Sequence, residues 1–199
     1  MLGIFLDTET NGLNFQKHKT LEIAFQILDV FDGQLKDTFH SIVSVSPEDW
    51  KKSDPESLRV NGFKWEEVAQ GPSPQDVGLK IQESFAKNGI KRGEAVFICQ
   101  NPSFDRVYFS QLVDPDLQEK LLWPYHWLDL ASMYWTEAMK KGALGTGNYP
   151  WETGYSKDKI AVTCQLPTEE RPHRAMNGVQ HLLLCYKVIV GFPGRPKAT

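Results

Sequence analysis

Residues 3–13 read GIFLDTETNGL, an apolar run that ends in two carboxylates and a turn. In an extended strand, side chains two residues apart share a face, so Asp7 and Glu9 should point the same way with Cα atoms roughly 6.5–7 Å apart. At an effective dielectric constant near 20, two unit charges about 5 Å apart repel by about 3 kcal/mol. Either one acid is protonated, or both are solvated at a strand end, or they share a cation. Oxygen-only ligands of this kind suit Mg²⁺ or Mn²⁺.

The composition is that of one globular domain. At 199 residues, with 41% hydrophobic and 24% charged residues, the chain is long enough for a single sizeable core. We expect the domain to cover residues 1–190 and residues 191–199 to form a mobile C-terminal tail. The net charge of −3 argues against a protein that grips long duplex nucleic acid through many phosphate contacts.

The three cysteines, Cys99, Cys164 and Cys185, are odd in number and widely spaced, which predicts neither a disulfide framework nor a zinc site. This usage fits a reducing compartment. The N-terminus has no basic region before its short apolar run, and no stretch approaches 18 apolar residues. We therefore expect a soluble cytoplasmic protein with no membrane segment.

The first half of the chain predicts an antiparallel meander. Residues 20–30 are rich in strand formers, Asp32-Gly33 is a hairpin turn signal, and residues 34–45 resume as a strand. Residues 46–54 are polar and leave the sheet. A short helix over residues 55–60 is stopped by Asn61-Gly62.

Helices and strands alternate in the second half. The spacing of apolar residues predicts helices over residues 77–87, 104–113 and 174–190, another helix that runs through Met139, and a short helix that opens at residues 156–158. Residues 94–100 form a compact apolar strand, HWLDL (residues 126–130) includes a short one, and residues 142–154 form a loop. The fold class is therefore α/β, a mixed sheet of about five strands flanked by helices.

Three stretches carry the candidate functional residues. In chain order they are Asp7-x-Glu9, QNPSFD (residues 100–105) at a strand-to-helix turn, and RPHRAMN (residues 171–177) at the start of the last helix. This ordered set resembles the DEDDh (DnaQ-like) exonucleases, which include proofreading subunits and ribonuclease T and share a ribonuclease H-like fold. PESLRVNGF (residues 55–63) and WLDL (residues 127–130) extend the resemblance over nearly the whole chain.

The resemblance implies removal of nucleotides from 3′ ends with two metal ions, Mg²⁺ or Mn²⁺. Asp7 would bridge both ions, Glu9 would hold the first, and Asp105 would support the second directly or through water. His173 would be the general base for the attacking water. The residues that would bind the terminal nucleotide or support its site are Thr10, Gly12, Leu13, Val60, Asn61 and Asn101.

One position departs from the family's pattern. The family's last motif places an aspartate five residues after the histidine, but Gly178 stands there, and residues 174–190 contain no acid. Glu169, Glu170 and Asp158 are near in sequence, and whether one of them replaces the missing carboxylate stays open. Gly178 is either a natural divergence or an introduced inactivating change. On this alignment, Gly178→Asp should raise the exonuclease rate by roughly 10-fold or more.

Ordinary structural roles compete with the functional ones. Asp105 suits the first turn of a helix, where the dipole favours an acid, and His173 could be a solvated surface residue. Tyr149, Trp151 and Tyr155 either pack within their loop, which we favour, or stack on unpaired bases. Several lysines and arginines either attract phosphates or are charged surface without a role: Lys17, Lys19, Lys157, Lys159, Arg171 and Arg174.

Three functions remain open. The first is a metal-dependent 3′-to-5′ exonuclease on single-stranded DNA or RNA ends, weakened by Gly178. The second is a catalytically impaired module of the same fold that still binds nucleic-acid ends. The third is a structural subunit. The sequence leaves the choice between DNA and RNA and the oligomeric state open, with a homodimer among the options.

Overall fold

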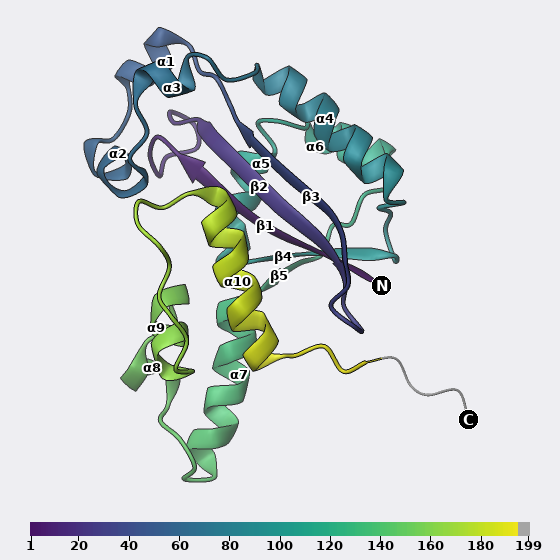
Figure 1. The fold of residues 1–199 in the computed structure, drawn as a ribbon, viewed down its shortest axis with the longest axis vertical. Coiled ribbons are helices and arrows are strands. Elements are labelled where there is room, and N and C mark those ends of the chain that lie inside the picture. The colour runs from purple at the N-terminus through teal and green to yellow at the C-terminus, as the bar shows by residue number, and fades with distance from the viewer. Residues whose placement is uncertain (195–199) are drawn as a thin grey trace.

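The computed structural model describes residues 1–194, and its centre is one mixed sheet (Figure 1). The strands lie in the order β3-β2-β1-β4-β5. β1 pairs with β2, and β2 with β3, in antiparallel fashion, whereas β4 runs parallel to β1 and β5 parallel to β4. The strands are β1 (Leu2–Thr10), β2 (Thr20–Asp29), β3 (Leu35–Ile42), β4 (Ala95–Cys99) and β5 (Trp127–Asp129). The predicted mixed five-stranded α/β sheet is confirmed.

Helices cover both faces of this sheet (Figure 1). In chain order, the helices of residues 1–194 are α1 (Pro47–Lys51), α2 (Pro55–Asn61), α3 (Trp65–Val68), α4 (Pro74–Lys87), α5 (Pro102–Phe109), α6 (Pro115–Lys120), α7 (Leu130–Ala143), α8 (Pro150–Thr153), α9 (Lys157–Thr163) and α10 (Ala175–Ile189).

The alternation of side chains along β1 decides where its acids point. Ile4 and Leu6 are buried in the cluster that also contains residues of α4 and α5, whereas Phe5 is buried with residues of α7, α9 and α10. Because the side-chain period of a strand is two, Asp7 and Glu9 continue the face of Phe5. The two acids therefore point to the α10 side of the sheet, at the end of the central strand.

An aromatic core fills the layer between the sheet and α4. Phe85 of α4 lies 4.6 Å from Trp123 between ring centroids, and Phe97 of β4 stacks on Trp127 at 3.9 Å. Ser73 begins α4 by accepting a hydrogen bond from the Asp76 backbone N–H, with Pro74 at the first helical position. This layer fixes β1 and β4 rigidly and so sets the position of the residues at their carboxyl ends.

The start of α10 is held by a hydrogen bond to the sheet and by an ion pair with α3. The backbone N–H of Ala175 donates to Glu22 Oε2 of β2 at 2.7 Å. The guanidinium of Arg174 pairs with Glu67 of α3, with Nη1 2.7 Å from Oε1. Phe5 meets Tyr186 edge-on further along α10, at 4.9 Å between centroids. These contacts hold the segment before α10, which carries His173, above the end of β1.

Several element bounds differ from the sequence prediction. Residues 46–54 contain α1, which Ser46 caps and Pro47 opens, and residues 142–154 contain α8. The helix expected over residues 104–113 is α5, which ends at Phe109. In the predicted tail, Phe192 packs against Tyr186 at 5.7 Å between centroids. The remainder of that tail, residues 195–199, lies outside the described residues.

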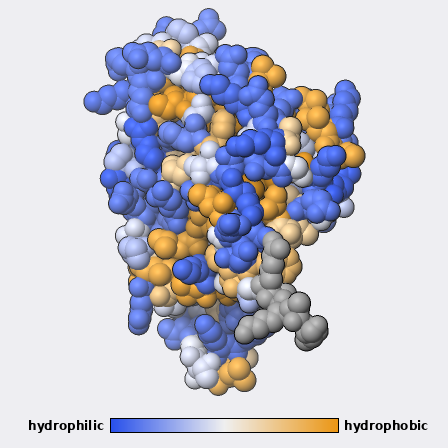
Figure 2. Space-filling view, turned by 45° about the vertical axis from the view of Figure 1, so that its right-hand side comes forward, coloured by the Kyte–Doolittle hydropathy of each residue, from blue (hydrophilic) through white to orange (hydrophobic). Residues whose placement is uncertain are grey.

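Hydrophobic side chains form separate patches among hydrophilic ones on the face that Figure 2 presents. Within residues 1–194, no helix combines the length and the apolar composition needed to cross a bilayer.

Candidate active site

Three predicted acids and the predicted base line one cleft of about 250 Å³. Asp7 and Glu9 come from the end of β1, Asp105 from the first turn of α5, and His173 from the segment before α10. Asp105 is buried, and its Oδ1 accepts a hydrogen bond from Thr8 Oγ1 at 2.8 Å. The segments that carry these residues are far apart in sequence, so their convergence depends on the fold.

The turn before α5 explains the position of Asp105. Asn101 adopts a left-handed conformation with φ of 59°, and Pro102 follows at the first helical position. The Asn101 backbone N–H donates to Asp129 Oδ1 at 3.0 Å, which joins the carboxyl ends of β4 and β5. The turn therefore points the first turn of α5 back toward β1.

Two further charged residues, Lys157 and Glu169, enter the same cleft. The Lys157 ammonium lies 2.9 Å from Glu169 Oε2 and 3.3 Å from Asp7 Oδ1. It also donates to the backbone carbonyl of Gly178 at 3.3 Å. Both side chains are largely buried, with 12% of Lys157 and 2% of Glu169 exposed, so this is a shielded ionic network.

Glu169 also faces the predicted base. Its Oε1 lies 3.4 Å from Nδ1 of His173, while the backbone N–H of His173 donates to the carbonyl of Val60 at 3.1 Å. A carboxylate at Nδ1 favours the tautomer with the proton on that nitrogen and leaves Nε2 as an acceptor. His173 is 24% exposed and lines the cleft, so its second nitrogen can meet a water there.

Gly178 lies directly against Asp7. A Cβ atom at position 178 would come within 2.2 Å of Asp7 Oδ2, so any other residue there would force one of the two to move. Position 178 therefore faces the cleft, as the alignment requires. Of the acids near in sequence, Glu169 and Asp158 line the cleft, and Glu170 is not among its lining residues.

The carboxyl groups of the cleft are strongly perturbed. Burial raises the pKa of Asp7 to about 6, against the opposing effect of Lys157, and burial together with the charge of Asp7 raises the pKa of Glu9 to about 8. Burial and Asp7 also raise the pKa of Asp105 well above its usual range. These carboxyl groups therefore hold their protons more strongly than they would in water.

Glu169 and Lys157 are perturbed in the opposite sense. Burial acts to raise the pKa of Glu169, but the neighbouring His181, with Nδ1 3.8 Å from Oε2, and the Lys157 ammonium outweigh it and lower that pKa to about 2. Burial acts to lower the pKa of Lys157, but Asp7 and Glu169 outweigh it and raise that pKa. Lys157 and Glu169 thus form a fully charged pair at neutral pH.

The fit of this cleft to divalent cations is partial. Three oxygen-donor residues, Asp7, Glu9 and Asp105, line it, and a cation would offset the cost of ionising these buried and mutually close acids, which their raised pKa values reflect. Within residues 1–194, however, no group of three or more acidic, histidine or cysteine residues could hold a metal ion as placed. Lys157 already contacts one Asp7 oxygen, and Asp105 accepts from Thr8.

The predicted nucleotide-contacting residues fall into two groups. Hydrogen bonds join residues 10–12 to Asn61: Thr10 Oγ1 donates to the Gly12 carbonyl at 2.8 Å, and Asn61 Nδ2 donates to the Thr10 carbonyl at 2.9 Å. Leu13 is 78% exposed at the tip of this turn. Asn101 lies at the start of α5, and the cleft is lined by its neighbour Gln100 instead.

Sequence reasoning gave no cleft role to Lys157 and left that of Glu169 open. Lys157 appeared only among possible phosphate-attracting residues, because a lysine at the start of a short helix has no distinctive pattern. The glycine at position 178, where the family's pattern has an acid, is the sequence signal that could have indicated another charged group beside Asp7. His181, which we regarded as an ordinary residue, is buried and donates from Nε2 to the Pro167 carbonyl at 3.0 Å.

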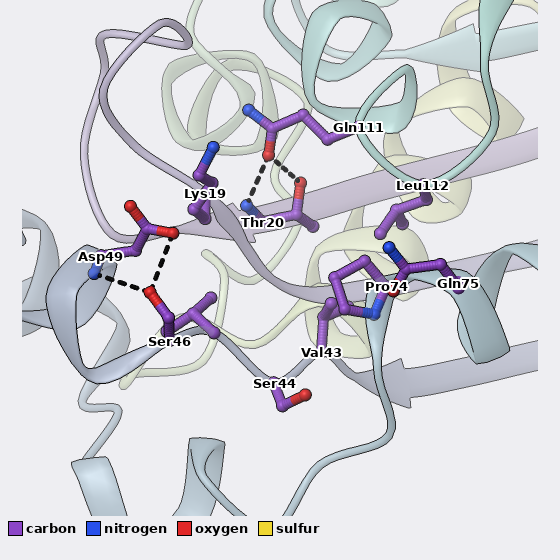
Figure 3. A pocket seen from close by; sticks show the side chains of 11 residues that line it. Lys19, Thr20, Val43, Ser44, Ser46, Asp49, Pro74, Gln75, Gln111 and Leu112 are labelled. Carbon is purple, nitrogen blue, oxygen red and sulfur yellow. Dashed lines mark hydrogen bonds between the residues drawn. The ribbon is translucent and has the colours of Figure 1, made fainter.

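A larger hollow of about 420 Å³ lies elsewhere and shares no lining residue with the acidic cleft (Figure 3). Its polar groups are largely paired with one another: Ser46 Oγ donates to Asp49 Oδ2, and Gln111 Oε1 accepts from the Thr20 backbone N–H. We therefore assign the chemistry to the smaller cleft, where the acids and His173 meet.

Comparisons with known proteins identify the family of this chain. The family model RNase_T, described as "Exonuclease", matches residues 4–183. Ribonuclease T of Actinobacillus pleuropneumoniae serotype 5b (strain L20) is 25% identical over 118 residues, which cover 56% of this chain and 53% of that protein. Ribonuclease T of Histophilus somni (strain 129Pt) is 26% identical over 53% of this chain and 50% of that protein. The matches thus span about half the length of these relatives.

Solved structures show the same fold at low sequence identity. Cell-death related nuclease 4 (CRN-4) superposes with a TM-score of 0.70 at 15% identity, over 96% of this chain and 64% of that one. The zinc-bound complex of Escherichia coli ExoI with single-stranded DNA has a TM-score of 0.71 at 14% identity, over 94% and 40% of the two chains. Together with the family match across most of the sequence, this places the chain in the DEDDh (DnaQ-like) exonuclease family, with its ribonuclease H-like fold.

Proposed function

We propose that the protein is a divalent-metal-dependent exonuclease that removes nucleotides from the 3′ ends of single-stranded DNA or RNA. The observation that carries the proposal is the convergence of Asp7, Glu9, Asp105 and His173 on one cleft. Membership of the exonuclease family supports it, and so does the complex of ExoI with single-stranded DNA.

In this proposal Asp7, Glu9 and Asp105 hold the metal. A bound divalent ion would lower the pKa of a water molecule and offset the charge that develops on the phosphate. His173 takes the proton of that water at Nε2, while Glu169 keeps the proton at Nδ1 in place. The water oxygen bonds to phosphorus, the bond from phosphorus to the 3′ oxygen of the preceding nucleotide breaks, and a nucleotide 5′-phosphate leaves.

The turn that follows β1 positions the terminal nucleotide. Leu13 offers an exposed apolar side chain for contact with a base, and Val60 lies opposite it in the family's pattern. Val60 is joined to His173 through its carbonyl, and Asn61 is joined to Thr10. The base-contacting turn and the catalytic histidine are thus connected by hydrogen bonds on one side of the cleft.

Exposed aromatic side chains near the cleft favour single strands over duplex. Trp151 is 58% and Tyr155 49% exposed, although the rings also pack on one another, with Tyr149 stacked on Trp151 at 4.7 Å. Gln100, which lines the cleft, donates to the Tyr155 carbonyl at 3.2 Å. Unpaired bases stack on such rings, whereas the bases of a duplex are unavailable.

Digestion of 5′-labelled single-stranded DNA and RNA with Mg²⁺ or Mn²⁺ tests the proposal. We expect a ladder of labelled products that shorten from the 3′ end, and no products in excess chelator. A 3′-labelled strand should release labelled mononucleotide at once. Cleavage that continues in chelator, or internal products without a ladder, would contradict the proposal.

A second candidate is a module that binds nucleic-acid ends without useful turnover. The contact of Lys157 with Asp7, together with glycine at position 178, favours it because both reduce what Asp7 can offer a metal. Fluorescence anisotropy with labelled oligonucleotides distinguishes the two: this candidate predicts binding that survives in chelator and no digestion under any metal condition.

A further inference from the structure

The two carboxylate oxygens of Asp7 have different surroundings. Oδ1 lies 3.3 Å from the Lys157 ammonium, whereas Oδ2 faces Gly178, where an added Cβ would lie 2.2 Å away. A carboxylate bridges two cations by presenting oxygen to each of them. One side of Asp7 is therefore already committed to a cation that belongs to the protein.

The Lys157 ammonium is held in place by a complete set of acceptors. Its three hydrogen-bond donors match three oxygens, on Asp7, Glu169 and the backbone of Gly178, at 3.3, 2.9 and 3.3 Å. Only 12% of the side chain is exposed. A lysine with this many partners is a fixed component of the cleft, in contrast to a mobile surface charge.

Glycine at position 178 is what makes this arrangement possible. A side chain there would displace Asp7, and an acid there would add a fourth carboxylate beside it. The ammonium instead reaches the Gly178 carbonyl and pairs with Glu169, an acid that approaches from the other side and also faces His173. Glycine at position 178 and the ammonium of Lys157 therefore both make the surroundings of Asp7 less negative than an acid at position 178 would.

We propose that this cleft binds one divalent ion and that the Lys157 ammonium supplies the second positive charge beside Asp7. This inference rests on the proposed function and replaces the two ions that the family resemblance implies. Glu169 serves as the counter-ion of Lys157 and the partner of His173, and not as a metal ligand. The remaining ion belongs with the acids that Lys157 leaves free, Glu9 and Asp105, and with Oδ2 of Asp7.

The number of bound ions tests the inference directly. Isothermal titration calorimetry with Mn²⁺, supported by electron paramagnetic resonance of bound Mn²⁺, should give one ion for the unchanged chain. Lys157→Gln frees Asp7 Oδ1 and Glu169 together, so its count should rise to two. Lys159→Gln is the matched control, because Lys159 is an exposed lysine on the same helix, and it should keep a count of one.

Two outcomes would overturn the inference: two ions of comparable affinity in the unchanged chain, or one ion in a folded Lys157→Gln variant. If Lys157→Gln fails to fold, the number of ions bound by the unchanged chain still tests the inference. Lys157→Met is then a second variant in which the ion count can be measured. Digestion assays on the same samples keep the two proposals apart. An active chain with two ions refutes only this inference, whereas a chain that neither binds Mn²⁺ nor digests any strand refutes the proposed function as well.

Discussion

Two buried glutamates of this protein each face a histidine, and the two pairs differ in what surrounds them. Glu22 meets His40 across neighbouring strands, with Oε1 2.6 Å from Nε2, and its other oxygen accepts from the Ala175 backbone at 2.7 Å. Glu169 meets His173 at 3.4 Å, and its other oxygen pairs with Lys157 inside the acidic cleft.

The difference separates an anchor from a reactive group. One oxygen of Glu22 holds the start of α10 and the other pairs with His40, which lies at the surface with 46% of its side chain exposed. Glu169 lies at a longer distance from His173, and the His173 imidazole lines the cleft, where its other nitrogen can meet a water. The first pair should therefore matter for stability and the second for turnover.

Asp7→Asn should give the largest effect, a fall of hydrolysis to background. The variant removes a charge that a metal needs but keeps the side chain's size, and it lowers the repulsion among the cleft acids. We therefore expect the thermal unfolding midpoint without metal to stay unchanged or rise. Initial digestion rates and thermal melts check both parts. An active Asp7→Asn variant would remove the central acid from the mechanism.

His173→Ala should lower kcat by roughly 100-fold or more and leave KM nearly unchanged, because a general base acts on the chemical step. His40→Ala is the matched change at the other pair and should leave kcat close to normal. Steady-state kinetics on a short single-stranded oligonucleotide compare the two. If both variants lost kcat equally, the Glu169–His173 pair would have no special role in turnover compared with the Glu22–His40 pair.

The free energy of unfolding should depend on pH mainly through the acids of the cleft and less through the Glu22–His40 pair. Without metal, the pKa values of about 6 for Asp7 and about 8 for Glu9 mean that the folded protein binds more protons than the unfolded chain between about pH 4 and 8. The free energy of unfolding should thus fall as pH rises through this window, by on the order of a few kcal/mol. Urea unfolding at pH 5 and pH 8 in chelator measures it.

Two controls identify the source of that slope. Mg²⁺ should restore stability at pH 8, and the double variant Asp7→Asn with Glu9→Gln should flatten the curve. The slope left in the double variant then belongs to Asp105, whose pKa burial raises, and to His40, whose pKa is raised by its hydrogen bond to Glu22; both contributions are lost as pH rises. The lowered pKa of Glu169 has the opposite effect, because it increases the free energy of unfolding as pH rises. That increase is complete once the pH has passed the pKa of Glu169 in the unfolded chain, which lies below most of this window. A flat curve for the unchanged chain would contradict the perturbed acids.

Glu22→Leu should give the smallest effect, a loss of about 2 kcal/mol in the free energy of unfolding. The change leaves the Ala175 N–H at the start of α10 without its acceptor, and an unsatisfied buried group costs about 1–3 kcal/mol. Urea unfolding measures the loss, with the exposed Glu66→Leu as control. If both variants unfold alike, Glu22 is not the anchor of α10.

Periodicity and caps predicted most of the fold, because they act locally. The strand formers of residues 20–30, the apolar spacing of Val77, Ile81 and Phe85, and the Asn61-Gly62 stop all correspond to observed elements. The helix α6 was missed although Asp114 and Pro115 carry a start signal, since a helix this short shows no apolar period. Local signals therefore found long elements better than short ones.

The site was predicted only as far as its motifs reach. Asp7, Glu9, Asp105 and His173 stand in recognisable patterns, and the fold brings them together. Lys157 and Glu169 meet only through tertiary packing of a short helix and an irregular segment. The expected gain in exonuclease rate from Gly178→Asp must also be revised. The new side chain would push Asp7 out of its present position, and the contact of Asp7 with Lys157 leaves no space for that movement.

The distance along the chain between the halves of the cleft has a consequence for biosynthesis. Lys157 follows Asp7 by 150 residues, and His173 comes later still. As the ribosome extends the chain, the acids of β1 emerge first, and the sheet can begin to form around them while their basic partners are still unmade. The cleft is completed last, when the final helix docks. A growing polypeptide that has reached only β5 therefore carries the acids of β1 without Lys157 and His173.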